Sequence, residues 1–254
     1  MPSLKPWYKV ATPREDLRKG QSVDTSEFAV HLNDVVSGRA PEYYRKPEPF
    51  FDRTYLTEGL KDVSSEVLRR LTGETVASSP VINLTTQFGG GKTHALTLLY
   101  HLAKNGKAAN KWAGVKDILA KAQLSSVPQA AVAVFVGTEF DSVKGIGAPG
   151  EPKRKTPWGE IAWQIGGQAA FAEVAEHDAQ MKRPGKDVIR SFLPEGKPVL
   201  ILMDEVLNYL NHARTFTVGG STLAAQVAQF FQNLSEVATS RSGLSLVLSL
   251  PASE

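Results

Sequence analysis

Two short groups of residues have the types and spacing that nucleotide chemistry requires. In the first group, an apolar run at 81–84 leads into a glycine-rich turn and the expected start of a helix: Gly89, Gly90, Gly91, Lys92, Thr93 and His94. Successive glycines let backbone N–H groups face phosphate oxygens, and the helix N-terminus adds partial positive charge. In such a loop the lysine reaches the β- and γ-phosphates and the threonine hydroxyl binds Mg²⁺. We therefore predict that these six residues bind a nucleotide.

This first motif departs from its usual form at one position. A glycine ordinarily stands where this chain has Thr86. A glycine-rich turn before an ordinary helix is the competing interpretation, because short motifs also occur by chance. The assignment consequently depends on a second, independent motif.

The second group follows another buried strand. Residues 199–203 are all apolar, and Asp204 and Glu205 come directly after them. A continuous apolar run suits a strand covered on both faces, and open α/β sheets bind ligands at the carboxyl ends of their strands. Asp204 suits direct or outer-shell binding of Mg²⁺, and Glu205 suits a base that polarises the attacking water. The pair favours hydrolysis, with Glu205 and Lys92 as catalytic residues.

The nucleotide is predicted to be ATP. Residues 110–113 begin like a guanine-recognition motif but lack the aspartate that would bind the base, which argues against a GTPase. The predicted cofactors are therefore ATP and Mg²⁺.

Composition narrows the class of protein. The chain has 254 residues, 42% of them hydrophobic, a net charge of +3 and no cysteine. Disulfides and thiolate metal sites are therefore excluded, and the charge is too small to indicate nucleic-acid binding by itself. No apolar run approaches a membrane span and the N-terminus does not begin a signal peptide, so we expect a cytoplasmic protein without membrane contact.

Strand and helix patterns alternate along the chain. Strands are expected at 81–84, 131–136, 199–203 and 244–250. This order predicts an α/β fold with a doubly wound, mostly parallel sheet of the P-loop NTPase type, preceded by a helical extension. We expect an arm and helical extension over 1–75 and the ATPase core over 76–254.

Several segments around these strands carry their own expectations. In the extension, Asp24 caps a helix ending at Gly38, and Thr57 caps a helix ending at Gly73. Between them, the proline- and aromatic-rich segment 39–51 is expected to be a packed linker, with adenine stacking as the alternative. Residues 208–220 are expected to form a loop, followed by a helix that Ser221 caps. The glycine-rich, basic segment 143–156 is expected to be a mobile, solvated loop, with contact to DNA or a partner as the alternative.

Taken together, these features resemble the AAA+-type ATPases. The similarity is closest to the N-terminal part of large prokaryotic ATPases grouped as domain of unknown function 499, and spans nearly the whole chain. It is carried by the segments 13–18, 26–32, 50–57, 88–94 and 156–164.

The resemblance implies roles for individual residues. Lys92 and Thr93 match the phosphate-loop lysine and threonine, and Asp204 and Glu205 match the second acidic motif. Ser249 lies in the strand that carries a polar γ-phosphate sensor in AAA+ proteins. Thr138 lies where such proteins often hold a polar switch that restrains the glutamate.

The resemblance also implies a biological setting. Members often occur beside DNA methylases in loci attributed to phage defence, so DNA or DNA-modification proteins are the expected partners, and a homo-oligomer is expected for the full-length form. An AAA+ core further needs a fifth strand, a helical lid and an arginine finger, so we expect a core truncated after its fourth strand that hydrolyses ATP slowly alone. The alternative function is a nucleotide-gated scaffold that binds ATP with little hydrolysis.

Overall fold

The computed structural model describes residues 6–12, 18–20, 30–76, 78–86 and 91–251, and the chain divides between Val30 and His31 into two compact units. In the first unit, α1 (Trp7–Val10) is a single turn of helix. The second unit holds both the expected helical extension from residue 31 and the expected core.

Four parallel strands form the central sheet, as the sequence predicted. They are β1 (Val81–Thr86), β2 (Ala131–Val136), β3 (Val199–Asp204) and β6 (Leu244–Pro251). Their spatial order is β1-β6-β3-β2, and each neighbouring pair is parallel. Every residue of β3 is buried, because this strand lies inside the sheet and is covered on both faces. The carboxyl ends of all four strands consequently lie at one edge.

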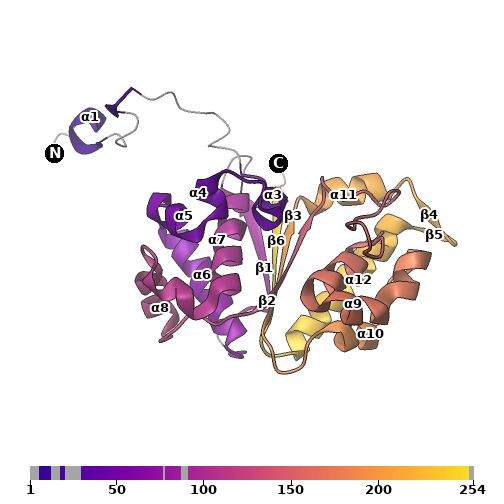
Figure 1. Cartoon of the computed structure of the whole chain (residues 1–254). Coiled ribbons are helices and arrows are strands. Elements are labelled where there is room, and N and C mark those ends of the chain that lie inside the picture. The colour runs from indigo at the N-terminus through magenta and orange to yellow at the C-terminus, as the bar shows by residue number, and fades with distance from the viewer. Residues whose placement is uncertain (1–5, 13–17, 21–29, 77, 87–90, 252–254) are drawn as a thin grey trace. The chain divides into compact units, whose positions relative to one another are not determined.

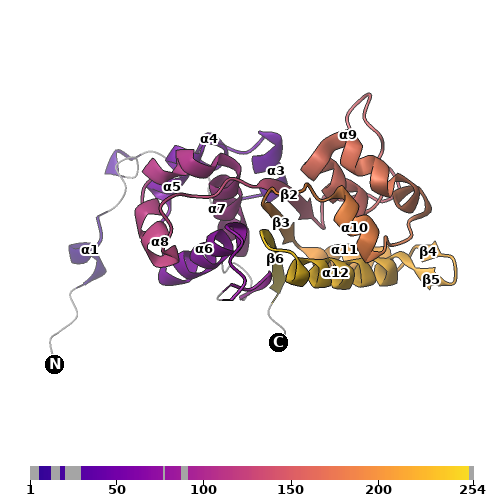
Figure 2. The same cartoon turned by 90° about the horizontal axis from the view of Figure 1, so that it is seen from below.

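Helices cover both faces of the sheet (Figure 1). One face carries α6 (Glu58–Leu71), α7 (Lys92–Asn105) and α8 (Val115–Ala122), with the 3-10 helix η2 (Gly106–Lys111) between the last two. The other face carries α9 (Pro157–Gln180), α10 (Lys186–Phe192) and α12 (Leu223–Ser240), and Figure 2 shows the same two layers from below. The α/β class with a flanked parallel sheet is confirmed.

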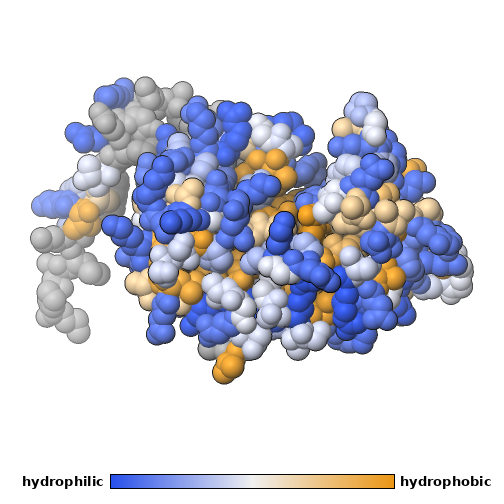
Figure 3. Space-filling view, turned by 60° about the horizontal axis from the view of Figure 1, so that its bottom comes forward, coloured by the Kyte–Doolittle hydropathy of each residue, from blue (hydrophilic) through white to orange (hydrophobic). Residues whose placement is uncertain are grey.

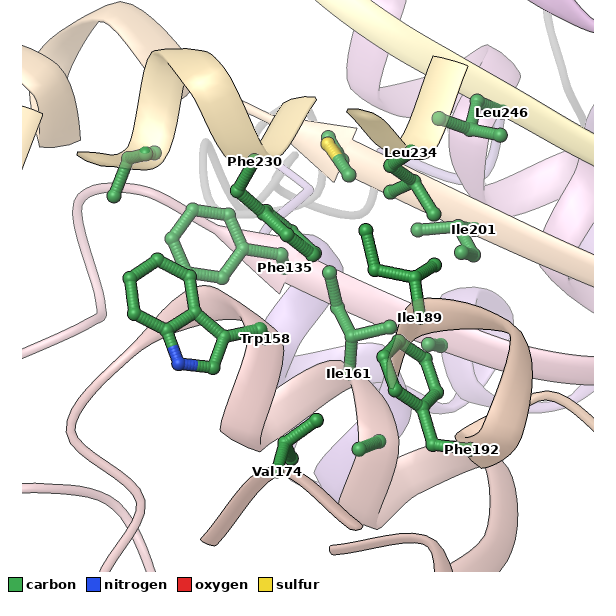
Figure 4. Packing of buried hydrophobic residues seen from close by; sticks show 14 of the residues in the cluster. Phe135, Trp158, Ile161, Val174, Ile189, Phe192, Ile201, Phe230, Leu234 and Leu246 are labelled. Atoms are coloured by element: carbon green, nitrogen blue, oxygen red, sulfur yellow. The ribbon is translucent and has the colours of Figure 1, made fainter. Parts of the chain in front are cut away.

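Each face of the sheet has its own apolar core. On the α9 side, Trp158 and Ile161 pack with Phe230 and Leu234 of α12 against Phe135 of the sheet (Figure 4). On the α7 side, a smaller cluster joins α6 and α7 to the sheet, and its buried residues include Val67, Leu71, Leu96, Leu99 and Leu200. Helix α12 has an apolar stripe that is entirely buried, because its positions recur at helical spacing: Leu223, Val227, Phe230, Leu234 and Val237.

The helical extension differs from the prediction at its start. The helix that ends at Gly38 is α3 (Leu32–Ser37), and its N-cap His31 has an extended backbone with φ −107° and ψ 115°. Val30 and His31 are therefore not helical, and Asp24, the predicted cap, lies outside the described residues. The predicted end is confirmed, because Gly38 adopts the left-handed conformation with φ 75° that terminates helices.

The segment predicted as a linker is mostly helical. It forms α4 (Glu42–Arg45) and α5 (Pro47–Arg53), because a proline in the first turn of a helix loses no hydrogen bond. Tyr44, Phe50 and Phe51 are buried, and the Phe51 ring lies 5.1 Å from that of Trp112. These three rings pack inside the protein, which supports the expected packing of this segment over the alternative of adenine stacking.

The loop prediction for 208–220 was wrong. Helix α11 (Val206–Ala213) takes up its first part, residues 208–213, and is anchored by the buried Tyr209. A short hairpin of β4 (Thr217–Val218) and β5 (Ser221–Thr222) follows, turning at Gly219, whose φ is 60°. Thr222, rather than Ser221, caps α12 by accepting a hydrogen bond from the Ala225 N–H at 3.3 Å.

Helix α9 contains a break that shifts its buried face. Gly166 and Gly167 have non-helical dihedral angles, with φ of −139° and 62°. Ala169, which uninterrupted periodicity places inside, is therefore exposed, while Phe171 and Val174 are buried.

The basic segment 143–156 is organised around a buried ion pair. Arg154 is 3% exposed. Its Nε donates to Glu160 Oε2 at 2.7 Å, and its Nη1 donates to Glu151 Oε2 at 2.9 Å. The Arg154 backbone also bridges that of Ile146. Arg154 is thus a structural residue here and offers no charge to DNA, contrary to the mobile basic loop that the sequence suggested.

A second buried arginine joins α6 to the far end of the chain. The Arg70 guanidinium is 1% exposed and donates to three backbone carbonyls: Leu244 O at 3.1 Å, Ala238 O at 2.6 Å and Arg241 O at 2.9 Å. Burial lowers the pKa of Arg70 from its usual value. Arg70 therefore fastens the helical extension to the turn between α12 and β6.

The face of the described chain that Figure 3 shows is mixed in polarity. The lysines near α8 are partly neutralised: Lys121 lies 2.5 Å from Asp62 and 3.2 Å from Glu58. Among the residues placed by the structure, no helix combines the length and apolar character needed to cross a membrane.

Candidate active site

The two predicted motifs meet at the edge formed by the carboxyl ends of the strands. Lys92 and Thr93 are the first residues of α7, which follows β1, and Asp204 is the last residue of β3. Strand β6 lies between β1 and β3 and carries Ser249 near its end. Of the three predicted loop glycines, Gly89 and Gly90 lie outside the described residues.

Gly91 provides the turn into α7. It is the N-cap of the helix and has a left-handed backbone with φ 77° and ψ 15°. A Cβ at this position meets no heavy atom within 4 Å, so the requirement for glycine here comes from the backbone conformation. Helix α7 has 14 residues and an N-terminus without acidic side chains in its first turn, which favours anions there.

One hydrogen bond joins the two motifs. Thr93 Oγ1 donates to Asp204 Oδ2 at 2.8 Å, across 111 residues of sequence. Asp204 is 4% exposed, and a buried carboxylate needs donors for both oxygens. The second oxygen, Oδ1, accepts from Ser249 Oγ and from the Glu205 N–H, the latter at 3.1 Å. The structure therefore brings three predicted residues, Thr93, Asp204 and Ser249, into direct contact.

Glu205 has an unusual backbone at the start of α11. Its φ of 53° and ψ of 35° are left-handed, a conformation that a residue with a Cβ adopts at a cost. Its N–H also lies 3.3 Å from Ser249 Oγ, and its carbonyl accepts from the Asn208 N–H at 3.1 Å. The residue itself is exposed. The backbone of the predicted base is thus held while its side chain remains accessible.

Gly137 contacts Glu205 closely and was missed as a site residue by sequence reasoning. It follows β2, and its N–H donates to Asp204 O at 2.9 Å. A Cβ on Gly137 would overlap the Glu205 carbonyl oxygen, so only glycine fits. The signal available in the sequence was a glycine directly after a buried strand.

Thr138, the predicted switch, is exposed in the turn after β2. In the part of the chain that the structure places, no hydrogen bond joins Thr138 to Glu205. The restraining role inferred from the resemblance therefore stays a prediction.

His94 packs against the helical extension. Its Nε2 lies 3.0 Å from Thr54 Oγ1, and its ring centroid lies 4.7 Å from that of Phe50. Thr54 donates its own proton to the Phe50 carbonyl at 2.7 Å, so the His94 Nε2–H is the donor in the contact with Thr54. Burial lowers the pKa of His94, which favours this neutral form. His94 thus fastens α7 to α5, and its predicted contact with nucleotide stays untested.

The donor set suits Mg²⁺ bound together with phosphates. Thr93 and Asp204 offer a hydroxyl and a carboxylate oxygen, the ligand types that Mg²⁺ prefers, and Mg²⁺ usually takes few protein ligands beside phosphates and waters. Within the described ranges, no group of three or more His, Cys, Asp or Glu side chains gathers into a separate metal site. Because Asp204 already holds the Thr93 hydroxyl, Thr93 is suited to contact the ion and Asp204 to orient Thr93.

Comparison with known families gives one result for this chain. A family model described as the DUF499 N-terminal domain matches residues 8–254. A search of curated proteins finds no match.

Proposed function

The chain belongs to the DUF499 N-terminal domain family, and from this premise and the geometry of the site we propose that it binds Mg-ATP and hydrolyses it. The observation that carries the proposal is the hydrogen bond from Thr93 to Asp204. It joins the start of the helix after the glycine-rich turn to the acidic end of a buried strand, and P-loop NTPases hold Mg²⁺ with a hydroxyl and a carboxylate from these two places.

Each residue has a defined task in this proposal. Lys92, at the first position of α7, neutralises charge on the β- and γ-phosphates. Thr93, oriented by Asp204, holds the ion, and bound Mg²⁺ supplies further neutralisation of phosphate charge. Glu205 accepts a hydrogen bond from the attacking water and orients it toward the γ-phosphate. Catalysis thus consists of positioning and charge neutralisation.

Two substitutions test the assignment. Lys92→Ala removes the cation that faces the phosphates, so ATP binding measured by calorimetry with Mg²⁺ should be lost. Glu205→Gln keeps the shape of the side chain without its basic oxygen, so binding should persist while single-turnover hydrolysis stops. Lys104→Ala is the matched control, because Lys104 is exposed on the same helix. Undiminished ATP affinity in the Lys92→Ala protein would contradict the site.

One observation favours the second candidate function, a nucleotide-gated scaffold with little hydrolysis. In the part of the chain that the structure describes, no side chain donates a hydrogen bond to the Glu205 carboxylate, so its orientation depends on its backbone alone. A single-turnover assay of bound, radiolabelled ATP separates the two functions: the scaffold retains intact ATP, whereas the hydrolase releases phosphate.

The resemblance also leads us to propose that the protein acts in a DNA-processing assembly. Its support is the association of similar proteins with DNA methylases, which is not a mechanism. Affinity purification from the native host, with identification of bound protein and DNA, tests this setting. Recovery of neither a DNA-modification protein nor DNA would count against it.

A further inference from the structure

Ser249 has hydrogen-bond partners that differ from those of a nucleotide sensor. It is 3% exposed. Its hydroxyl donates to Asp204 Oδ1 and accepts from the Glu205 N–H at 3.3 Å. A serine hydroxyl has one proton, and here that proton goes to a carboxylate of the protein. The oxygen retains only acceptor capacity, which cannot bond to a phosphate oxygen.

The same hydroxyl lies at the strained junction between β3 and α11. Glu205 adopts the left-handed conformation there, which is disfavoured for a residue with a Cβ. Such a backbone persists only when its surroundings hold it. The surroundings are the Asp204 carboxylate, the Ser249 hydroxyl and the closely packed Gly137.

We propose that Ser249 is a positioning residue that, with Gly137, holds Glu205 in its left-handed turn. Ser249 acts from β6 by fixing the Asp204 carboxylate and the Glu205 N–H together, and Gly137 acts from the end of β2 by leaving room for the Glu205 carbonyl. The kinetic part of this proposal rests on the proposed ATPase function. In this proposal Ser249 is not a γ-phosphate sensor. It acts on hydrolysis indirectly, through the position of Glu205, and need not touch the nucleotide.

The strand itself supplies a matched control. Ser245 lies on the same strand, is fully buried, and its Oγ has no hydrogen-bond partner among the described residues. Ser245→Ala and Ser249→Ala therefore remove the same atom from similar surroundings. Only the second removes a bond to the acidic motif.

The first experiment measures coupling without any nucleotide. Urea unfolding of Ser249→Ala, Asp204→Ala and the double variant forms a thermodynamic cycle, and alanine removes both acceptor oxygens of Asp204. We expect non-additivity of about tenfold or more in the unfolding equilibrium constant, because the two side chains share one hydrogen bond. The same cycle with Ser245→Ala should be additive. Additivity of Ser249→Ala with Asp204→Ala would overturn the proposal whether or not the protein hydrolyses ATP.

The second experiment measures chemistry separately from binding. In single-turnover assays, Ser249→Ala should slow hydrolysis by about ten- to a hundredfold, the effect of a small misplacement of a catalytic group. The Kd for ATP should change by less than about twofold, since the binding contacts remain. Ser249→Thr keeps the hydroxyl and should recover most of the rate, while Ser245→Ala should match the wild type.

Other outcomes decide against the proposal. Weaker binding of ATP but not of ADP by Ser249→Ala would restore the sensor role, and an unchanged hydrolysis rate would remove the positioning role. Should Ser249→Ala not fold, Gly137→Ala tests the same turn from the other side, and a wild-type rate there would equally overturn the proposal. Failure of the wild-type chain to bind ATP would instead count against the proposed function.

Discussion

At the scale of single residues, Glu205 combines an exposed side chain with a left-handed backbone held by β2, β6 and α11. Functional sites are where such strained conformations tend to be retained. Stability and function should therefore pull in opposite directions at this position.

Glu205→Gly tests that conflict. Glycine adopts a φ of 53° without steric cost, so the free energy of unfolding should rise by about 1 kcal/mol, while ATP turnover should be lost with the carboxylate. Gln123→Gly is the matched control, because the exposed Gln123 has a φ of 57°. Gln123→Gly should raise the free energy of unfolding by a similar amount in chemical denaturation and leave ATP turnover unchanged. A destabilised Glu205→Gly protein would show that the Glu205 carboxylate contributes more to stability than relief of the backbone strain does.

The candidate site could be predicted from sequence where local pattern determines chemistry. Asp204 and Glu205 end an apolar run, and Lys92 and Thr93 follow glycines, so both motifs were visible. The close approach of Gly137 to Glu205 was not, because it depends on β2 lying beside β3. Local patterns do not encode strand order, and the contacts of Ser249 likewise follow from β6 lying between β1 and β3.

At the scale of elements, helix α7 carries a buried histidine, His101, and a half-buried one, His94. His101 Nε2 donates to the Tyr44 carbonyl at 2.8 Å, and His94 donates to Thr54. Burial lowers the pKa of both imidazoles. Their neutral forms thus hold α4 and α5 against α7.

The histidines predict a loss of stability in acid. Because their folded pKa values lie below the unfolded value of 6.5, the unfolded chain binds more protons as the pH falls below about 6.5. Stability is therefore complete above that pH and declines below it, by up to about 1.4 kcal/mol per pH unit for each histidine. Urea denaturation of the wild type and of His94→Gln/His101→Gln across roughly pH 5 to 7.5 checks this. An equally steep decline in the double variant would assign the effect to other groups.

Strongly periodic elements were predictable, and interrupted ones were not. The stripe of α12 fixes its buried face through Val227, Phe230 and Leu234. In α9, Gly166 and Gly167 change the phase of the helix. A glycine pair is compatible with either a continuous or a broken helix, so sequence alone does not decide.

The break in α9 gives a paired prediction. Gly167 has a φ of 62° and a ψ of −145°, and a Cβ added there would meet open space, so Gly167→Ala should destabilise the protein by on the order of 1–3 kcal/mol through backbone strain alone. Gly59, exposed in α6 without a positive φ, also has open space. Gly59→Ala should instead stabilise by about 0.5–1 kcal/mol. The midpoint temperatures of thermal unfolding of the two variants should shift in opposite directions relative to the wild type. A shift in the same direction would exclude backbone strain at Gly167 as the cause.

At the scale of the whole second unit, Arg70 binds residues that lie 168 to 174 positions later in the sequence. Arg70→Met keeps the apolar stem and removes the donors to three carbonyls, so it should cost on the order of 3 kcal/mol. Arg69→Met is the neighbouring control, since the Arg69 Nε has no hydrogen-bond partner among the described residues. Similar midpoints of urea unfolding for the two variants would contradict the importance of the Arg70 contacts.

The sheet order also determines when the protein can fold during translation. Among the strands that the structure describes, β1 pairs with β6 alone, and one carbonyl that Arg70 binds lies 174 residues later in the sequence. At a synthesis rate of about 5–20 residues per second, roughly 10 to 35 s separate the appearance of Arg70 from that of its last partner. Throughout this interval the edge of β1 that pairs with β6 has no strand partner in the nascent chain. We therefore expect the emerging chain to expose an unpaired strand edge for longer than a fold built from neighbouring strands would.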